Sequence, residues 1–265
     1  MNILKDVVKF YREGGSDKHK ILYEYFESKA KEIKLLDEQF LACEGFGELA
    51  FSYHWYLLIK SLHTNAKFLE IGVYKGRVIA LINKLSDFFE KDMTVYGLTP
   101  LDTSGDKYSG YEDVDYLDQI KSTFKKSGIH PSRVNIIKGL SQDKDVIADA
   151  KQRGPYDIIF IDGSHDYEDV CSDLDNYYPL LKRGGCLVMD DASLYVKGAF
   201  GQFLGHEDVA KAIRDKIDES EKMKLTHLYA VGHNRVWMKM TTSAYVPFNK
   251  RRNFDKGMAD ALAYK

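Results

Sequence analysis

Between residues 67 and 240 the chain alternates short apolar runs with segments that have the spacing of an amphipathic helix. The run 158–161 reads Ile-Ile-Phe-Ile without a polar residue, as expected of a strand that is covered on both faces. The segment 77–89 instead places four aliphatic side chains on one helical face. This alternation predicts a largely parallel sheet with helices on both of its faces.

The same periodicity predicts each element of this region. The expected strands are 68–71, 94–98, 134–138, 157–161, 186–189, 225–231 and 235–240. The expected helices are 77–89, 113–126, 143–151, 167–181 and 207–217, of which the fourth should stop at Gly184-Gly185. Only Gly232-His233-Asn234 joins the last two strands, which is too short for a crossover helix, so these strands should pair antiparallel. We therefore predict an α/β, doubly wound, Rossmann-like fold whose mostly parallel seven-stranded sheet ends in an antiparallel C-terminal hairpin.

The chain before this region has a different pattern, helical and rich in aromatic residues. We expect a helical lid, a main domain and a tail, over residues 1–60, 61–240 and 241–265. The tail carries a small excess of basic residues. A subunit arm in a homo-oligomer, a flap and a solvated end are its alternative interpretations.

Composition and charge narrow the functional classes. The 265 residues include 38 Lys+Arg and 40 Asp+Glu, a net charge of −2, so the sequence lacks the basic excess of a nonspecific nucleic-acid binder. Its apolar runs are far shorter than the ~20 residues of a membrane helix, and residues 1–10 do not resemble a signal peptide. Three scattered cysteines indicate neither a disulfide framework nor a zinc site. We expect a cytoplasmic protein that binds a small molecule rather than nucleic acid or membrane.

A glycine turn follows the first expected strand. Residues 70–76 read Glu-Ile-Gly-Val-Tyr-Lys-Gly, so two glycines stand where the chain turns from strand to helix. Ligands of such sheets bind beyond the carboxyl ends of the strands, where a helix N-terminus offers free N–H groups. Position 74 is Tyr rather than the middle glycine of a dinucleotide fingerprint, which disfavours a NAD dehydrogenase. A turn without a ligand is the other interpretation.

The pattern E-x-G-x-x-x-G resembles the first motif of the class I S-adenosylmethionine (SAM) methyltransferases. In that family the loop backbone passes the amino-acid part of the cofactor, and the acid helps to orient it. The resemblance implies a cofactor site that includes Glu70, Gly72, Tyr74 and Gly76.

Two neighbouring strands of the predicted sheet end in acidic residues. Asp162 follows one strand, and Asp190 and Asp191 follow the next. Carboxylates gathered at one edge of a sheet repel each other unless a cation lies between them, and hard oxygen ligands suit Mg²⁺. Capping of a helix or turn is the common alternative, above all for Asp166. Three acids beyond two strand ends favour a divalent metal site.

One stretch of the chain carries a closer resemblance. It reads D-G-S-H-D-Y at 162–167, Y-P-L-L at 178–181, G-G at 184–185 and D-D at 190–191, and G-S-D-K occurs at 15–18. In order over residues 14–240, these motifs look like the macrocin O-methyltransferase and cephalosporin-hydroxylase-like group. The resemblance implies that Asp162, Asp190 and Asp191 hold Mg²⁺, with Asp162 also facing the cofactor. It further implies that His165, three residues after the first acid, is the catalytic base.

The second strand departs from the class I pattern. An acid usually ends this strand and accepts both ribose hydroxyls, whereas this chain has Thr99 there and Asp102 three residues later. Either Asp102 reaches back, or Thr99 makes a single weaker contact, or the cofactor pocket is altered. The exit of the third strand, at Gly139, Leu140 and Ser141, fits the adenine-side loop, and a plain turn is the equal alternative.

Two long connections, 99–113 and 192–206, lie on the expected ligand side of the sheet. Their aromatic side chains form either a wall of the substrate site or ordinary loop anchors: Tyr108, Tyr111, Tyr195, Phe200 and Phe203. The histidines without ligand spacing are expected to be structural or on the surface: His54, His63, His130, His206, His227 and His233. The stripe of Trp55, Leu58 and Ile59 is expected to be core.

Together these features predict a Mg²⁺-dependent SAM O-methyltransferase that acts on a hydroxyl of a small molecule, either a sugar or another natural product. A relative with hydroxylase-like chemistry is the second interpretation. A non-catalytic SAM-binding subunit is the third, and the intact set of acids with His165 argues against it.

Overall fold

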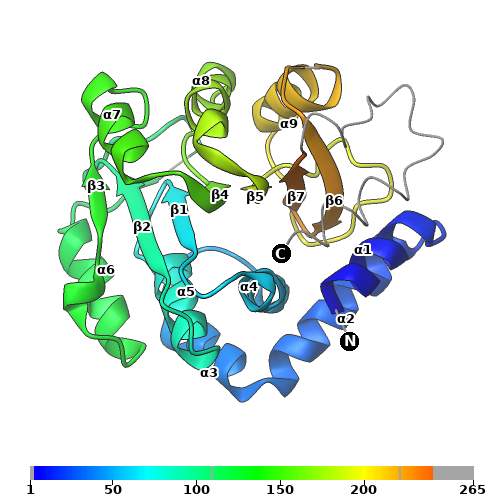
Figure 1. The fold of residues 1–265 in the computed structure, drawn as a ribbon, viewed down its shortest axis with the longest axis horizontal. Coiled ribbons are helices and arrows are strands. Elements are labelled where there is room, and N and C mark those ends of the chain that lie inside the picture. The colour runs from blue at the N-terminus through cyan, green and yellow to red at the C-terminus, as the bar shows by residue number, and fades with distance from the viewer. Residues whose placement is uncertain (1–2, 109, 221, 241–265) are drawn as a thin grey trace.

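The computed structural model describes residues 3–108, 110–220 and 222–240. At its centre is one seven-stranded sheet with the order β3-β2-β1-β4-β5-β7-β6 (Figure 1). The strands are β1 (Lys67–Ile71), β2 (Thr94–Thr99), β3 (Ile136–Lys138), β4 (Tyr156–Ile161), β5 (Leu181–Met189), β6 (Leu225–Val231) and β7 (Asn234–Lys239). β1 to β5 run parallel, whereas β7 pairs antiparallel with both β5 and β6. The predicted sheet with its C-terminal hairpin is confirmed.

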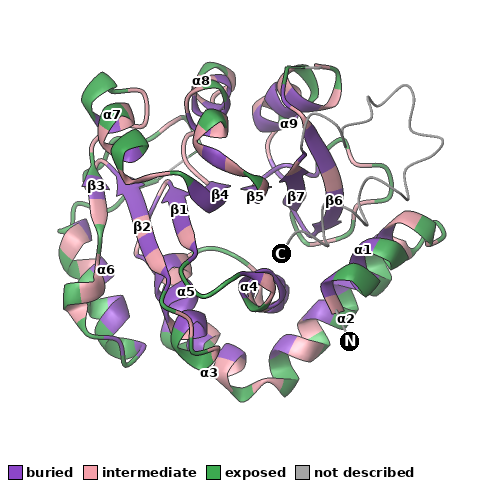
Figure 2. Ribbon diagram, in the orientation of Figure 1, coloured by how far each residue is buried: buried purple, intermediate pink, exposed green. Residues whose placement is uncertain are grey.

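Helices cover both faces of this sheet. The described α-helices are α1 (Ile3–Glu13), α2 (Lys18–Glu32), α3 (Lys34–Ala42), α4 (Leu49–Ser61), α5 (Arg77–Phe88), α6 (Tyr116–Lys126), α7 (Lys144–Arg153), α8 (Tyr167–Tyr177) and α9 (Glu207–Ile213). α7, α8 and α9 lie on one face, and α4, α5 and α6 on the other (Figure 1). Side chains alternate along each strand, so Leu69 and Ile159 enter the core under the first group of helices, and Phe68 and Phe160 enter the core under the second. Figure 2 shows that the strands of the sheet are mostly buried.

The N-terminal helices are part of the second core. α1, α2 and α4 pack against β6, and their buried side chains join those of α5 and the sheet. Trp55, Leu58 and Ile59 are almost fully buried, so the stripe predicted to be core is confirmed. The loop between α3 and α4 lies near the carboxyl ends of β4 and β5. The division into lid, domain and tail stays a prediction, and the tail lies outside the described residues.

One predicted helix end is wrong. α8 ends at Tyr177, and a short helical turn with Pro179 separates it from β5. Gly184 and Gly185 belong to β5 itself, where the pairing with β4 shifts in register. A Cβ at position 185 would lie 2.8 Å from the carbonyl oxygen of Asp157. Gly185 therefore allows two strands to approach each other and does not stop a helix.

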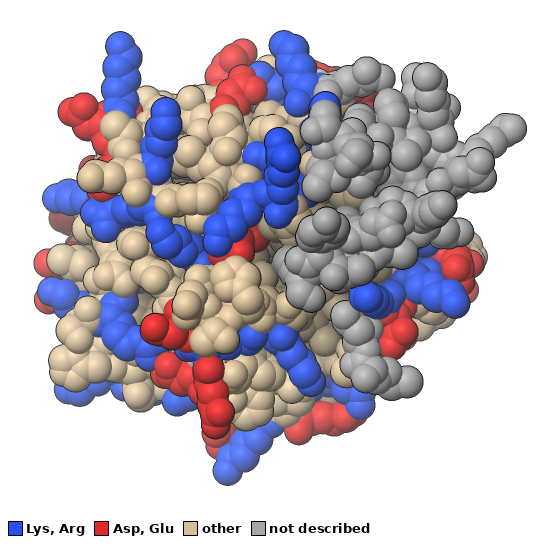
Figure 3. All heavy atoms as spheres, viewed as in Figure 1, with Lys and Arg blue, Asp and Glu red and all other residues tan. Residues whose placement is uncertain are grey.

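Other predicted boundaries move by a few residues. α6 and β3 begin at Tyr116 and Ile136, later than expected. α9 ends at Ile213 and continues as a short π-helical turn to Asp218. In the part of the chain that the structure describes, no helix has the length and apolarity needed to cross a membrane. Basic and acidic side chains are both spread over the face drawn in Figure 3.

Candidate active site

The carboxyl ends of β1 and β2 open into a first cavity of about 340 Å³. This volume lies in the range of small-molecule sites, ~300–1,000 Å³. The predicted cofactor residues that line it are Gly72, Tyr74, Thr99, Asp102, Leu140 and Ser141. Those that do not line it are Glu70, Gly76, Gly139 and Asp162. The structure therefore brings most of the predicted cofactor residues together around one cavity.

Two glycines in left-handed conformations build the turn after β1. Gly72 has φ +95°, and a Cβ there would lie 1.8 Å from the carbonyl oxygen of Asp162. Gly76 has φ +81° and precedes α5, and a Cβ there would meet the side chain of Ile120 at 3.1 Å. Gly72 thus forms part of the cavity wall, whereas Gly76 allows the close approach of α5 and α6.

Glu70 and Gly139 support the cavity without lining it. Glu70 is buried at the end of β1, where it accepts a hydrogen bond from the backbone of Ile79. Burial raises the pKa of Glu70 to about 8, and its Oε2 atom has no hydrogen-bond partner. A Cβ at Gly139 would lie 2.4 Å from Cγ2 of Val146 in α7. Gly139 therefore makes room for a helix rather than for the ligand.

The two candidates for contact with a ribose, Thr99 and Asp102, each accept a hydrogen bond from a backbone N–H two residues later. The Thr99 hydroxyl oxygen accepts a hydrogen bond from the backbone N–H of Leu101 at 3.4 Å. The Asp102 carboxylate accepts one from the backbone N–H of Ser104 at 2.8 Å. Both residues face the first cavity, so each of them is available to a bound nucleoside.

A second cavity of about 390 Å³ lies beside the first. Gly72, Tyr74, Tyr111 and Gly163 line both cavities and form their common wall. The remaining lining residues are mainly acids, imidazoles and aromatic side chains: Phe46, Gly47, Glu48, Tyr108, Gly110, Asp162, His165, Asp190, Asp191, Gln202, Phe203, His206 and His233. The two cavities therefore adjoin, so that ligands bound in both would lie next to each other.

The three acids predicted to bind metal all face this second cavity. The backbone N–H of Asp162 donates to Ile71 at 2.8 Å and that of Asp190 to Ile161 at 3.0 Å, which extends the sheet ladder to both acids. Burial and the neighbouring carboxylates of Asp190 and Asp191 raise the pKa of Asp162 well above its usual value, and Asp162 and Asp190 share a hydrogen bond. Crowded carboxylates of this kind are a donor set that fits a divalent cation.

His165 is held between two carboxylates. Its Nδ1 lies 2.7 Å from Oδ2 of Asp106, and its Nε2 lies 2.9 Å from Oδ2 of Asp191. Burial alone would lower the pKa of His165, but the hydrogen bond and charge of Asp191 and the charge of Asp106 outweigh burial and raise it. Asp191 itself adopts a left-handed backbone with φ +52°, which is uncommon for a residue other than glycine.

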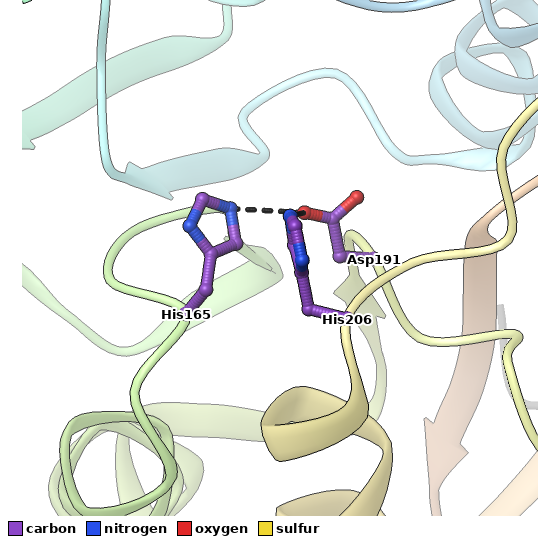
Figure 4. A group of neighbouring side chains, drawn as sticks. All are labelled: His165, Asp191 and His206. Carbon is purple, nitrogen blue, oxygen red and sulfur yellow. Dashed lines mark ion pairs between the residues drawn. The ribbon is translucent and has the colours of Figure 1, made fainter. Parts of the chain in front are cut away.

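Two histidines that we expected to be structural or on the surface, His206 and His233, line this cavity. His206 Nε2 is 3.6 Å from Asp191 Oδ2, and His233 Nε2 is 3.2 Å from Asp190 Oδ1. Figure 4 shows His165, Asp191 and His206 arriving from three segments of the chain and pointing toward one another. The loop after β5 returns so that the backbone N–H of His206 donates to the carbonyl of Asp191 at 3.2 Å.

The predicted aromatic wall is present in part. Tyr108, Tyr111 and Phe203 line the second cavity, and Tyr195 and Phe200 do not. The Tyr108 ring lies 4.1 Å from the ring of His206, measured between centroids. Phe46 also lines this cavity, although no pattern in the sequence singled it out.

Asp166 stands at the predicted cap position of α8. Its side chain makes no capping hydrogen bond and instead lies 3.4 Å from the ammonium group of Lys107. The predicted cap position is therefore right, but the capping bond is not formed.

Comparison with known proteins gives a family match and a relative of similar sequence. Residues 69–192 match a family model that is described as a methyltransferase domain. An uncharacterised protein of Acanthamoeba polyphaga mimivirus is 30% identical over 151 residues, which make up 55% of this chain. The match spans only 62% of the length of that relative.

Several solved structures share the fold at low sequence identity. An O-methyltransferase from Bacillus cereus in complex with SAH has a TM-score of 0.53 at 15% identity, covering 80% of this chain and 96% of its own. Cofactor-bound Rv0187 from MTB has a TM-score of 0.51 at 16% identity, covering 80% and 89%. The methyltransferase MycE of the mycinamycin pathway, in complex with Mg and SAH, has a TM-score of 0.50 at 21% identity, covering 81% and 56%. Residues 69–192 are therefore similar to a methyltransferase domain, and the chain shares the fold of these solved methyltransferase structures.

Proposed function

We propose that this chain is a divalent-metal-dependent O-methyltransferase that transfers the methyl group of SAM to a hydroxyl of a small molecule. The observation that carries the proposal is the common wall of the two cavities, formed by Gly72, Tyr74, Tyr111 and Gly163. A methyl donor in the first cavity and a hydroxyl in the second would meet where the two cavities adjoin, beside these four residues. Holding two reactants in register in this way supplies much of the rate gain in group transfer.

The first cavity fits the donor. The left-handed turn at Gly72 brings the backbone of residues 72–74 close to the ligand space. Thr99 and Asp102 offer oxygen atoms to a ribose, and Ser141 lies on the side expected for the adenine. When bound, SAM supplies an electrophilic methyl group on a positively charged sulfur.

The second cavity fits the acceptor and its activation. Asp162, Asp190 and Asp191 would hold a divalent cation, which when bound lowers the pKa of a hydroxyl next to it. Asp106 would orient His165 through Nδ1, and Nε2, which lies 2.9 Å from Asp191 in the metal-free chain, would accept the hydroxyl proton once Asp191 holds the cation. The acceptor oxygen then forms its bond to the methyl carbon as the carbon–sulfur bond breaks, which leaves S-adenosylhomocysteine and a protonated imidazole.

The walls of the second cavity indicate the class of acceptor. Tyr108, Tyr111 and Phe203 supply aromatic surface, and Gln202 supplies an amide beside the acids and imidazoles. Ligand sites combine apolar surface with a few placed polar groups. A sugar, or a natural product with neighbouring hydroxyls, presents this mixture and offers two oxygens to one cation.

Calorimetry and turnover together test the proposal. We expect S-adenosylhomocysteine to bind with or without Mg²⁺, because its cavity does not include the three acids. We expect methyl transfer from labelled SAM to a hydroxylated acceptor to stop with EDTA, and Asp190→Asn to weaken Mg²⁺ binding while the chain stays folded. Undiminished transfer in EDTA would remove the metal from the reaction. Oxidation of the acceptor without methyl transfer would favour the hydroxylase-like interpretation.

A further inference from the structure

His233 lies next to the acidic residues although it is far from them in the sequence. It belongs to the turn between β6 and β7, and β7 pairs with β5 so that Arg235 stands opposite Met189. This register places the turn beside Asp190, which directly follows β5. His233 is buried, with 7% of its surface exposed, and it lines the second cavity together with Glu48 and Asp190.

The two ring nitrogens of His233 face two different carboxylates. Nε2 lies 3.2 Å from Oδ1 of Asp190, and Nδ1 lies 3.5 Å from Oε1 of Glu48. One donor atom from each of His233, Asp190 and Asp191 fits within 4.8 Å of the others. A histidine that ligates a metal through one nitrogen almost always gives its other N–H to a carboxylate or a carbonyl. The position of Glu48 behind His233 matches this arrangement.

Two buried atoms of this arrangement lack hydrogen bonds. They are Oε1 of Glu48 and Nδ1 of His233, which face each other. The other oxygen of Glu48 accepts a hydrogen bond from the hydroxyl of Tyr23, so α2 fixes the carboxylate from behind. The Phe51 ring meets the imidazole edge to face, with 4.7 Å between centroids. Unpaired buried polar atoms are costly. A cation at Nε2 would make Nδ1–H a stronger donor and would favour a hydrogen bond from it to Oε1 of Glu48, 3.5 Å away.

We propose that His233 is an imidazole ligand of the cation site, joining Asp190 and Asp191, and that Glu48 orients it. This inference rests on the metal site of the proposed function and goes further by adding a nitrogen donor. Imidazole suits transition metals such as Zn²⁺ and Ni²⁺ better than it suits Mg²⁺ or Ca²⁺. The site should therefore bind Zn²⁺ or Ni²⁺ more tightly than Mg²⁺, and Mn²⁺ serves as its spectroscopic probe.

Pulsed electron paramagnetic resonance of bound Mn²⁺ tests this assignment without measuring activity. We expect the full chain to bind Mn²⁺ and to show the nitrogen coupling of a directly bound imidazole, which changes when the protein carries ¹⁵N-labelled histidine. The coupling should be absent in His233→Gln and present in His165→Gln and His206→Gln, whose side chains lie in the same cavity. If His233→Gln does not fold, coupling retained in the other two variants still assigns the ligand by elimination.

The outcomes separate this inference from the proposed function. Mn²⁺ binding without histidine coupling, or coupling that survives in His233→Gln, would overturn the inference and leave the metal site standing. Absence of Mn²⁺ binding would overturn both, while calorimetry with S-adenosylhomocysteine would still report on the donor cavity.

Glu48→Gln tests the orienting carboxylate. We expect about 10–100-fold weaker Mn²⁺ binding with the nitrogen coupling retained, and no change for the exposed His130→Gln. Unchanged Mn²⁺ affinity in Glu48→Gln would remove the orienting role of Glu48.

Discussion

Gly72 lies against the backbone carbonyl of Asp162, so closely that a Cβ at position 72 would stand 1.8 Å from the oxygen. The contact joins the turn after β1 to the residue that follows β4, two neighbouring strands of the sheet. Gly72 lines both cavities, and Asp162 lines the second. Any side chain at position 72 would therefore push the donor turn away from the acidic residues.

We expect Gly72→Ala to lose both stability and binding of S-adenosylhomocysteine. The φ of +95° strains any other residue by about 1–3 kcal/mol, and the clash with Asp162 adds to this strain. Denaturant unfolding and calorimetry measure the two losses. Gly184→Ala is the control for φ alone, because Gly184 has φ +75° and a Cβ at that position would meet nothing within 4 Å. Equal effects of the two substitutions would mean that the contact with Asp162 is unimportant.

Asp162→Asn should separate metal binding from folding. Burial and the charges of Asp190 and Asp191 disfavour an ionised Asp162 in the metal-free chain, so an amide should not lower metal-free stability. Wild-type protein with Mg²⁺ at a hundred times its Kd should gain about 2.7 kcal/mol, and the variant should gain much less. Thermal unfolding with and without Mg²⁺ measures both quantities. The exposed Asp145→Asn should keep the full gain, and a full gain in Asp162→Asn would exclude Asp162 as a ligand.

Asp173 should make the chain less stable as the pH rises. Burial raises the pKa of Asp173 to about 7, and a hydrogen bond with Ser141 lowers it only in part. Between about pH 4 and pH 7 the unfolded carboxyl has lost its proton while the folded one keeps it, so unfolding becomes easier with rising pH. A pKa difference of about three corresponds to roughly 4 kcal/mol once the pH is above 7.

Asp173→Asn should remove this dependence. Compared with wild type, the variant should gain stability between pH 5 and pH 8, because its amide never ionises. Urea unfolding at the two pH values measures the gain. Asp92→Asn, at an exposed position, should run parallel to wild type. A variant of Asp173 that does the same would show that the buried carboxyl does not control the pH dependence.

The sheet could be predicted because its signals are local. A few neighbouring residues are enough to predict an unbroken apolar strand such as Ile158–Ile161, or a turn such as that at Gly72. The glycine pair at 184–185 shows where local evidence fails, because a helix stop and a close strand contact call for the same residue. Only the neighbouring strand, with the Asp157 carbonyl 2.8 Å from a Cβ at 185, distinguishes the two.

The histidines of the site could not be predicted in the same way. His206 reaches Asp191 because the long loop 192–206 folds back to the end of β5. No spacing of residues in the sequence predicts this contact. His233 had a weaker signal that we did not use. The predicted hairpin already placed its turn beside the strand that ends at Asp190. Residues after strand ends could be grouped from topology alone, whereas residues brought by loops required the structure.

The pair of His165 and Asp106 should control proton removal from the acceptor hydroxyl. His165→Gln should lower kcat by about 10²–10⁴-fold, the usual contribution of a general base, and leave the affinity for S-adenosylhomocysteine unchanged. Asp106→Asn should lower kcat less, because the ring keeps its Nε2 and loses only the carboxylate 2.7 Å from Nδ1. Single-turnover rates with labelled SAM measure both effects, and His130→Gln, at an exposed turn, serves as the control. If His165→Gln keeps the wild-type rate over a range of pH, the proton goes to another group.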